Sequence, residues 1–453
     1  MNTKRLLLPA LLSGLLFTAA GSVSAQGNAL DDQVRTRAAA VEQKMIQWRR
    51  DIHQHPELGG QETRTAKLVA DHLRKLGLEV RTEVGSTGVV GILRGGKPGK
   101  TVALRADMDA LPVQEPAGLP FASKATGKYL GKEVPVMHAC GHDAHTAMLM
   151  ATAEVLAGMR ESLPGNVMFL FQPAEEGPSL FTPGEGKSWG AKLMLEEGAF
   201  KPLKPDAVFA VHVMPGPSGQ LSWRSGATTA ASDTLDITVS GKQGHGGMPW
   251  NTIDPIVTSA MVVSGLQTVV SRQANLTLSP AVVTVGMING GSGPNVIPES
   301  VALSGTVRSY DESVRKQLRE DIKQSAQNIA ASTGAEAKVA IQPMYSTTVN
   351  NDKLVARMEP VLRRAADGKV AQAGLVGASE DFSFFAQETP GLYMFLGVTP
   401  KGQDPAKAAP NHNPRFFVDE SALVVGVRAM SMAAADFLAG QGQGGAAAKG
   451  AAR

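Results

Sequence analysis

The chain has 453 residues, with 44 basic and 41 acidic side chains, 43% hydrophobic residues and a single cysteine. At about 150 residues per domain, this length indicates two or three domains with a large buried core. The 49 glycines and 27 prolines are spread along the whole chain, which excludes a collagen-like or wholly disordered protein. The charge is nearly balanced and no long basic run occurs, so the sequence predicts no nucleic-acid partner.

The N-terminal segment, residues 1–25, has the composition of a targeting signal. It begins with Lys4 and Arg5, continues with an apolar stretch over residues 6–20, and ends on small side chains. This pattern is typical of a secretory signal peptide that is cleaved after Ala25. The apolar stretch is shorter than the roughly 20 residues of a spanning helix, which disfavours the alternative of a membrane anchor. We therefore expect a periplasmic or secreted protein with no membrane contact after cleavage.

Export makes the single cysteine, Cys140, informative. Extracytoplasmic compartments are oxidising, and proteins there usually pair their cysteines or lack them. Cys140 has no second cysteine in its own chain. A lone thiol indicates an intermolecular disulfide, a reactive nucleophile or a metal ligand, and its neighbours must decide between them.

Helices and short apolar strands alternate along most of the chain. The spacing of apolar residues predicts helices over 31–50 and 61–76, with Gly77 as a stop. Short apolar runs then predict strands, separated by helical patterns; the strands are 102–104, 167–171, 207–213 and 392–396, and the helices are 145–160, 190–197 and 354–366. Elements that alternate in this way predict an α/β fold with a mostly parallel sheet.

Residues 225–344 follow a different pattern. They contain in order a strand, a helix, two strands, a long charged helix and a strand, at 235–239, 255–270, 281–285, 301–307, 312–331 and 337–341. The order β-α-β-β-α-β is the ferredoxin-like pattern. We therefore expect an α+β domain inserted into the first domain, which consists of residues 30–224 and 345–439. Residues 440–453 are expected to form a flexible tail.

Polar side chains follow the predicted strands at the point where each strand ends. Asp107 and Asp109 follow the strand at 102–104, Glu175 and Glu176 follow the strand at 167–171, and His212 lies at the end of a third. Open α/β sheets place their ligands at the carboxyl ends of their strands. Two adjacent glutamates in such a turn can divide the work, one binding a metal and the other taking a proton from water.

A thiol and three imidazoles lie within one short segment, residues 138–145, which contains His138, Cys140, His142 and His145. Thiolate, imidazole and carboxylate are ligands of zinc, manganese and cobalt. A bound metal would also explain how an unpaired thiol survives export. The alternative is a buried small cysteine with surface histidines, and the nearby acids and His212 weigh against it.

Motifs from about Trp48 to Leu438 resemble one known family. They are RRDIHQHPELGGQE, ALRADMDALPV, HACGHDAHT, QPAEEG, AVHVMP, GHGGMP, GPNVIPE, SGTVRS, GASEDFSFF and NHNPRF. HACGHDAHT followed by QPAEEG is the most specific pair. The motifs resemble the metallopeptidase family of aminoacylases and carboxypeptidases, in the branch of hippurate hydrolases and indole-acetyl-amino-acid hydrolases.

The resemblance implies a site with two divalent metal ions, whose identity (Zn, Mn, Co or Ni) stays open. It implies five ligands, with the thiol bridging the two ions: Cys140, His142, Glu176, His212 and His412. Glu175 resembles the general base, and Asp109 with Asp107 resembles acids that orient the ligands from behind. His145 is expected to orient a neighbour, and His53 and His55 to support the fold.

The resemblance also implies that the inserted domain is a lid and dimerisation domain. His245 resembles a histidine that reaches the site of a neighbouring subunit and stabilises the oxyanion, although it could be a plain loop histidine. Asn295 and Arg308 resemble groups that hold a substrate carboxylate, which suits the forked guanidinium. The alternatives are a turn former for Asn295 and a structural ion pair for Arg308.

Three departures from the family pattern concern the surroundings of the site. Trp250 stands where the family usually has a histidine, and residues 126–134 and 181–189 look like insertions. Both insertions are expected to adjoin the site and to change substrate shape preference more than chemistry.

These observations together predict an exported di-metal amidohydrolase that cleaves the amide bond of N-acyl amino acids or related small amides. The alternative is a metallo-exopeptidase or dipeptidase that acts on short peptides. A more remote alternative is an exported metal-binding protein without catalysis. In the favoured interpretation the partners are a small-molecule substrate and a second copy of the chain, bound through the inserted domain.

Overall fold

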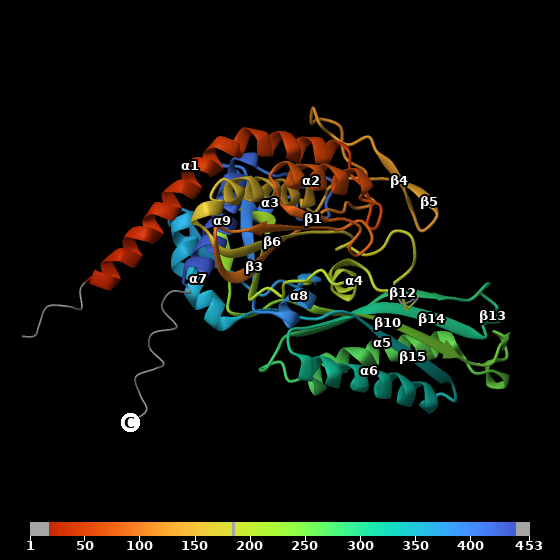
Figure 1. Cartoon of the computed structure of the whole chain (residues 1–453). Coiled ribbons are helices and arrows are strands. Elements are labelled where there is room, and N and C mark those ends of the chain that lie inside the picture. Colours follow the sequence, from red (N-terminus) through yellow and green to blue (C-terminus); the bar gives the residue numbers. More distant parts are fainter. Residues whose placement is uncertain (1–17, 184–185, 441–453) are drawn as a thin grey trace, which may run out of the picture.

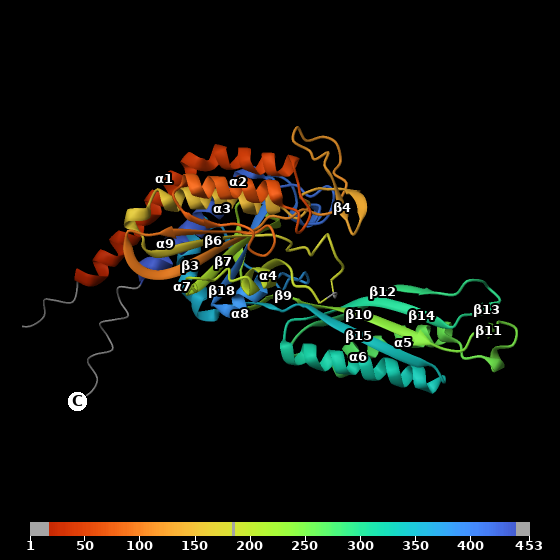
Figure 2. The ribbon, with the colours of Figure 1, turned by 45° about the vertical axis from the view of Figure 1, so that its right-hand side comes forward.

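The computed structural model describes residues 18–183 and 186–440. The expected signal segment falls mainly on residues 1–17, and the expected tail falls on residues 441–453, outside the described residues. Both expectations therefore stay predictions. Two sheets organise the chain, and Figures 1 and 2 show them side by side.

An eight-stranded sheet has the order β1-β2-β6-β3-β7-β18-β8-β17. Its strands are β1 (Glu79–Arg81), β2 (Val89–Arg94), β3 (Lys97–Asp107), β6 (Pro164–Gln172), β7 (Ala207–Pro217), β8 (Leu221–Trp223), β17 (Val370–Gln372) and β18 (Gly391–Thr399). The four central strands β6, β3, β7 and β18 are parallel, while β2 and β8 join this centre antiparallel. The mostly parallel sheet that the sequence predicts is thus confirmed, with antiparallel strands towards its edges.

Helices cover both faces of this sheet. The helices are α1 (Thr18–Gln54), α2 (Thr63–Lys75), α3 (His142–Ala157), α4 (Gly190–Glu196), α7 (Asp352–Ala365), α8 (Phe382–Glu388) and α9 (Leu423–Ala439). Along β3, Val102 and Leu104 pack with α1, α3 and α9, whereas Ala103 packs with α4 and α8. Alternate residues of one strand therefore point to opposite helical layers, as a strand buried on both faces requires.

One described helical stretch, Glu420–Ala439, is long and apolar enough to cross a membrane. Its apolar window is 78% buried inside the protein, and Figure 1 shows α9 within the layers of the main body. The stretch is therefore packed as a core helix.

The second sheet belongs to the inserted domain. Its elements are β10 (Ala231–Ser240), α5 (Pro255–Thr268), β12 (Ala281–Gly290), β14 (Ser300–Ser309), α6 (Glu312–Ser332) and β15 (Glu336–Tyr345). The strand order is β12-β14-β10-β15, all antiparallel, with the two helices packed over a separate core. This is the ferredoxin-like arrangement that the sequence predicts.

Three pairs of short strands connect the main and inserted domains or extend from them. β9 (Gly226–Thr229) and β16 (Thr348–Asn350) pair to form a ribbon between the main and inserted domains. β11 (Gly244–His245) pairs with β13 (Val296–Ile297) at the end of the inserted domain far from the main sheet (Figure 2). The insertion at 126–134 forms most of a hairpin of β4 (Thr126–Tyr129) and β5 (Lys132–Pro135).

Candidate metal centre

The topology brings the ends of several strands to one place. β3 ends at Asp107, β6 is followed by Glu175 and Glu176, and β7 carries His212. These strands are parallel neighbours, so their carboxyl ends lie along one edge of the sheet. The segment with the thiol and the imidazoles reaches the same edge, because α3 begins there at His142.

A glycine lets two candidate ligands leave one tight turn. Gly141 lies between Cys140 and His142 and has a φ of +93°, in the left-handed region. A Cβ at this position would lie 2.3 Å from a methyl carbon of Val213. A larger residue would therefore displace Val213 or the turn that presents both ligands.

The five predicted metal ligands form two groups that share the thiol: Cys140, His142 and His212 in one, and Cys140, Glu176 and His412 in the other. Within each group the ligand atoms all lie within 4.8 Å of one another. Cys140 Sγ lies 3.5 Å from His212 Nε2, and Glu176 Oε1 lies 2.9 Å from His412 Nε2. Cys140 thus belongs to both groups, so its sulfur is the atom that two bound ions would share.

His412 comes from a distant loop that backbone contacts hold in place. Its N–H donates to the carbonyl of Ala139 at 2.8 Å. The amide of the adjacent Asn411 donates to the carbonyls of Cys140 at 2.9 Å and Val213 at 3.0 Å. Asn411 therefore ties the His412 loop to the thiol. The sequence analysis missed this residue, although it lies in the motif NHNPRF.

Two of the imidazoles are anchored through one nitrogen and present the other to the cluster. His142 Nδ1 lies 3.1 Å from Asp109 Oδ1, and His212 Nδ1 donates to the carbonyl of Val213 at 2.8 Å. His142 Nε2 is buried and has no hydrogen-bond partner within the described part of the chain. This is the usual arrangement of histidine ligands, so the residues present fit a pair of metal ions.

The charges around the cluster also favour a cation. Burial lowers the pKa of His142, but Asp107 and Asp109 outweigh it and raise this pKa to about 10. Burial and the carboxylate of Glu176 hold the pKa of the Cys140 thiol well above its usual range. Because a metal ligand must be a thiolate, this sulfur needs a positive charge beside it. The sulfur, imidazole and carboxylate donors suit zinc, manganese, cobalt or nickel.

Asp107 and Asp109 lie behind the cluster and orient it. Asp109 Oδ2 accepts the backbone N–H of Glu176 at 2.9 Å while its other oxygen faces His142. Asp107 Oδ1 lies 2.6 Å from His145 Nδ1, and His145 Nε2 accepts the N–H of Val213 at 2.8 Å. Both nitrogens of His145 are engaged, which agrees with an orienting role for this residue.

Glu175 lies beside the cluster in a cavity of about 120 Å³. Four predicted ligands line the same cavity: Cys140, Glu176, His212 and His412. Glu175 Oε2 lies 3.9 Å from His142 Nε2. Burial and the nearby Glu380 raise the pKa of Glu175 well above its usual range. The structure thus places a carboxylate that can hold a proton beside the candidate metal pair.

The remaining walls of the cavity include residues that the sequence analysis did not select. The apolar ones are Met214, Val376 and Phe395. Glu380 also lines the cavity, and its carboxylate accepts hydrogen bonds from the Tyr393 hydroxyl at 2.5 Å and from Arg105 at 2.8 Å. Glu380 lies in the motif GASEDFSFF, which marked the segment as notable but gave no role to this acid.

The structure does not bring His245, Asn295 and Arg308 together within one chain. His245 is exposed on β11, and Asn295 precedes β13 at the same distant end of the inserted domain (Figure 2). Arg308 lies near the other end of β14. Val301 is at the start of β14, close in sequence to Asn295, and Arg308 lies seven residues further along, or about 24 Å at ~3.4 Å per residue. Its guanidinium pairs with no carboxylate among the described residues, so the structural ion pair is not found.

The described residues of the two insertions adjoin the site without lining its cavity. Leu130 at the tip of the β4–β5 hairpin donates its N–H to the carbonyl of Ser179, in the segment after Glu176, at 2.7 Å. In the other insertion, Trp189 Nε1 donates to the Tyr345 hydroxyl at 3.1 Å. Both insertions therefore contact the chain around the site.

His53 supports the fold, as the sequence analysis expected. It is buried on α1 and lies 2.9 Å from the carboxylate of Asp143 and 3.0 Å from that of Glu115. Arg49 also donates to Asp143, at 2.6 Å. These contacts fasten α1 to the start of α3.

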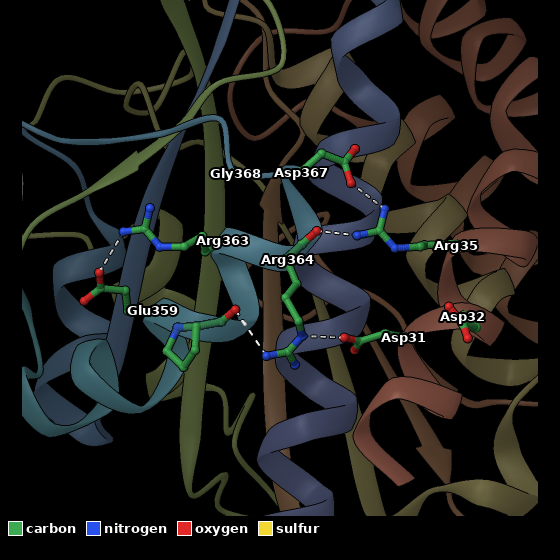
Figure 3. A pocket seen from close by; sticks show the side chains of 9 residues that line it. Asp31, Asp32, Arg35, Glu359, Arg363, Arg364, Asp367 and Gly368 are labelled. Atoms are coloured by element: carbon green, nitrogen blue, oxygen red, sulfur yellow. Dashed lines mark hydrogen bonds and ion pairs between the residues drawn. The ribbon is translucent and has the colours of Figure 1, made fainter. Parts of the chain in front are cut away.

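A wider surface hollow of about 850 Å³ lies between α1 and α7 (Figure 3). Charged side chains on its walls bind one another: Asp31 pairs with Arg364 at 2.6 Å, and Arg35 pairs with Asp367 at 2.7 Å. These ion pairs join α1 to α7 and the turn that follows it, so the walls of the hollow have a structural role.

The geometry above is that of a hydrolase with a two-metal cluster and a neighbouring base. Residues 103–436 match the profile described as Peptidase family M20/M25/M40, and the chain belongs to this family. The chain is 39% identical over 411 residues to thermostable carboxypeptidase 1 of Saccharolobus solfataricus, an alignment that covers 90% of this chain and 99% of the relative. It is also 39% identical over 351 residues to the hippurate hydrolase of Campylobacter jejuni, covering 77% of this chain and 86% of the relative.

A solved structure with the same fold is the YXEP protein of Bacillus subtilis, described as a dinuclear metal-binding peptidase. The TM-score is 0.72 with 31% sequence identity, over 88% of this chain and 99% of that one. The similarity confirms the fold and the family.

Proposed function

We propose that this protein is an exported di-metal amidohydrolase that cleaves the amide bond of N-acyl amino acids or related small amides. The observation that carries the proposal is the pair of ligand groups that share Cys140 next to Glu175. Relatives with hydrolase names support the same chemistry, among them a hippurate hydrolase.

Each ligand group would hold one ion. Cys140, His142 and His212 form the first site, and Cys140, Glu176 and His412 form the second. The ions, when bound, supply Lewis-acid polarisation of the scissile carbonyl and lower the pKa of water at the site. The donors do not select among zinc, manganese, cobalt and nickel.

Glu175 moves the proton. Its carboxylate lies in the cavity and accepts a proton from the attacking water, then returns it to the nitrogen of the leaving amine. The apolar walls formed by Met214, Val376 and Phe395 exclude water from the remaining volume and contact an apolar part of the substrate.

The inserted domain is proposed to act across a homodimer. His245 would stabilise the oxyanion and Asn295 would bind substrate in the partner's site, while Arg308 binds the substrate carboxylate. The distance of the first two from their own ligand cluster supports this arrangement. Apolar side chains exposed on the edge strand β12 and on α5 offer a surface for a second copy: Val257, Met261, Val282, Met287 and Ile288.

Export is proposed from the pattern of residues 1–25. N-terminal sequencing of the protein from a periplasmic or secreted fraction should begin at Gln26. An N-terminus at Met1 in the cytoplasmic fraction would contradict export and leave the chemistry untouched.

A metallo-exopeptidase that uses the same site is the second candidate. A relative named thermostable carboxypeptidase favours it. Metal analysis combined with hydrolysis of hippurate-type amides and free dipeptides, with and without a chelator, tests both candidates. We expect about two ions per chain, in line with the two ligand groups, and chelator-sensitive cleavage of the N-acyl amino acids. Preference for dipeptides would favour the second candidate, and one tightly held ion without any hydrolysis would favour a metal-binding protein.

A further inference from the structure

The turn that carries Glu175 and Glu176 is held by hydrogen bonds from separate parts of the chain. Ala174, just before the two glutamates, has a φ of +51°, an unfavourable value for a residue with a Cβ. Its N–H donates at 2.8 Å to the buried carboxylate of Glu62, at the start of α2. The N–H of Glu176 donates to Asp109 at 2.9 Å. These two contacts come from the main domain.

A third contact comes from the inserted domain. Tyr345 is the last residue of β15 and pairs there with Ser232 on β10. Its hydroxyl donates to the backbone carbonyl of Glu175 at 2.7 Å. The strand thus ends with a side chain that reaches the backbone of the proposed general base.

Tyr345 is itself held on both sides. Trp189, from the insertion at 181–189, donates its indole N–H to the Tyr345 hydroxyl at 3.1 Å. The ring of Phe384 on α8 lies edge-on to the Tyr345 ring, with centroids 6.4 Å apart and planes at 87°. The hydroxyl therefore has a fixed direction, because it accepts from Trp189 while it donates to Glu175.

The location of Tyr345 gives this contact a second consequence. Tyr345 lies three residues before β16, which pairs with β9 in the ribbon that joins the inserted domain to the main domain. A rotation of the inserted domain about this ribbon would move the end of β15 relative to the turn. The hydrogen bond to Glu175 then holds only in a limited range of orientations of the inserted domain.

We propose that Tyr345, fixed by Trp189, is a positioning residue that couples the orientation of the inserted domain to the placement of Glu175. The inference rests on the proposed role of Glu175 and adds the residues that place it. Tyr345 contacts the backbone of Glu175 and leaves the carboxylate free for the substrate. Its loss should therefore affect the chemical step more than substrate binding.

The test compares Tyr345→Phe with Thr36→Val, a control on the exposed face of α1 that also removes one hydroxyl donating to a backbone carbonyl, that of Asp32 at 2.9 Å. Tyr345→Phe should lower kcat by about threefold to tenfold, the effect of one lost hydrogen bond, with KM and metal content unchanged. Hydrogen exchange at residues 174–177 should become faster in the metal-free and metal-loaded protein, because the amides of this turn open more often. The control should match the wild type in both measurements.

Trp189→Phe gives a second, independent variant. It keeps the Tyr345 hydroxyl and should change kcat and exchange in the same direction by a smaller factor. If Tyr345→Phe fails to fold, unchanged exchange at 174–177 in Trp189→Phe overturns the proposal and faster exchange supports it. Values for Tyr345→Phe equal to those of the control also overturn it. A wild type that hydrolyses no amide refutes the proposed function instead, and the exchange comparison still decides whether Tyr345 places the turn.

Discussion

The ligand cluster of the main domain draws its residues from separate elements, whereas at the tip of the inserted domain the predicted residues have local contacts. His142 is buried and faces Asp109 from another strand end. His245 is exposed, and its ring accepts the N–H of Gly247, only two residues away. The backbone carbonyl of Asn295 accepts the N–H of Gly246.

This difference distinguishes residues that their own chain positions from residues that are open to contact with another molecule. Buried side chains with long-range partners are positioned by their own chain and can bind a metal as they stand. Exposed side chains on a short two-stranded turn are free to meet a group from outside the chain. The ligand cluster can therefore form within one chain, whereas the proposed role of the tip is to complete the site of a second copy. Four changes to the chain test this contrast.

The largest effect is expected from Glu175→Gln. The amide keeps the size of the side chain but cannot accept a proton, so turnover should fall by about 10²- to 10⁴-fold. Metal content should stay at the wild-type level, because Glu175 belongs to neither group that shares Cys140. Steady-state kinetics and metal analysis of the same preparation check both points. Activity close to wild type would remove Glu175 from the role of base.

Asp233→Ala should separate the stability of the inserted domain from the integrity of the cluster. Asp233 is buried on β10 and accepts from Arg315 at 2.6 Å and from Arg319 at 2.8 Å. Its loss leaves the buried Arg315 with only the carbonyl of Ser232 and the exposed carboxylate of Glu312. The free energy of unfolding should therefore fall by about 3 kcal/mol. Metal content should not change in the folded protein. The exposed Asp236→Ala on the same strand is the control and should cost under about 1 kcal/mol in denaturant unfolding.

His245→Ala should lower kcat by about 10²- to 10³-fold if the imidazole stabilises an oxyanion. Because His245 is exposed, neither the melting temperature nor the metal content should change. Co-expression with Glu175→Gln should then restore about a quarter of wild-type activity, since half of the dimers are mixed and each mixed dimer has one complete site. Absence of any restoration would show that the sites are not shared.

Trp250→Ala is expected to have the smallest effect. Trp250 is 76% exposed near the tip of the inserted domain. The free energy of unfolding should stay within about 0.5 kcal/mol of wild type, while KM rises for amides with apolar groups. A melting experiment and kinetics on two acyl chain lengths check this. A strongly destabilised variant would show that Trp250 packs within its own chain.

Many of the helices and strands can be predicted from the sequence, because the spacing of apolar residues that marks each one lies within a short segment. The central strands are apolar runs that end in polar motifs, and the charged helix α6 has a clear helical spacing with an N-cap at Asp311. Helix α9 was missed because it is buried on nearly all sides, so no polar face reveals a helical period. The edge strands β1 and β17, and β8 next to β17, have three residues each, too few for a periodic signal.

The candidate site divides in the same way. The five predicted ligands lie in motifs whose thiol, imidazole and carboxylate side chains indicate metal binding. The structure brings all five together. Glu62, Asn411 and Tyr345 were missed because each acts through a hydrogen bond to a backbone group distant in the sequence. No residue type marks such a bond, so only the folded chain reveals it.

The central claim is that one thiolate bridges two metal ions. Anomalous diffraction from crystals of the metal-loaded protein tests it most directly. The account predicts two peaks, each within about 2.3 Å of Cys140 Sγ if the ions are zinc, with one near His142 and His212 and the other near Glu176 and His412. A single peak, or two peaks that both lie beyond bonding distance of the sulfur, would contradict it.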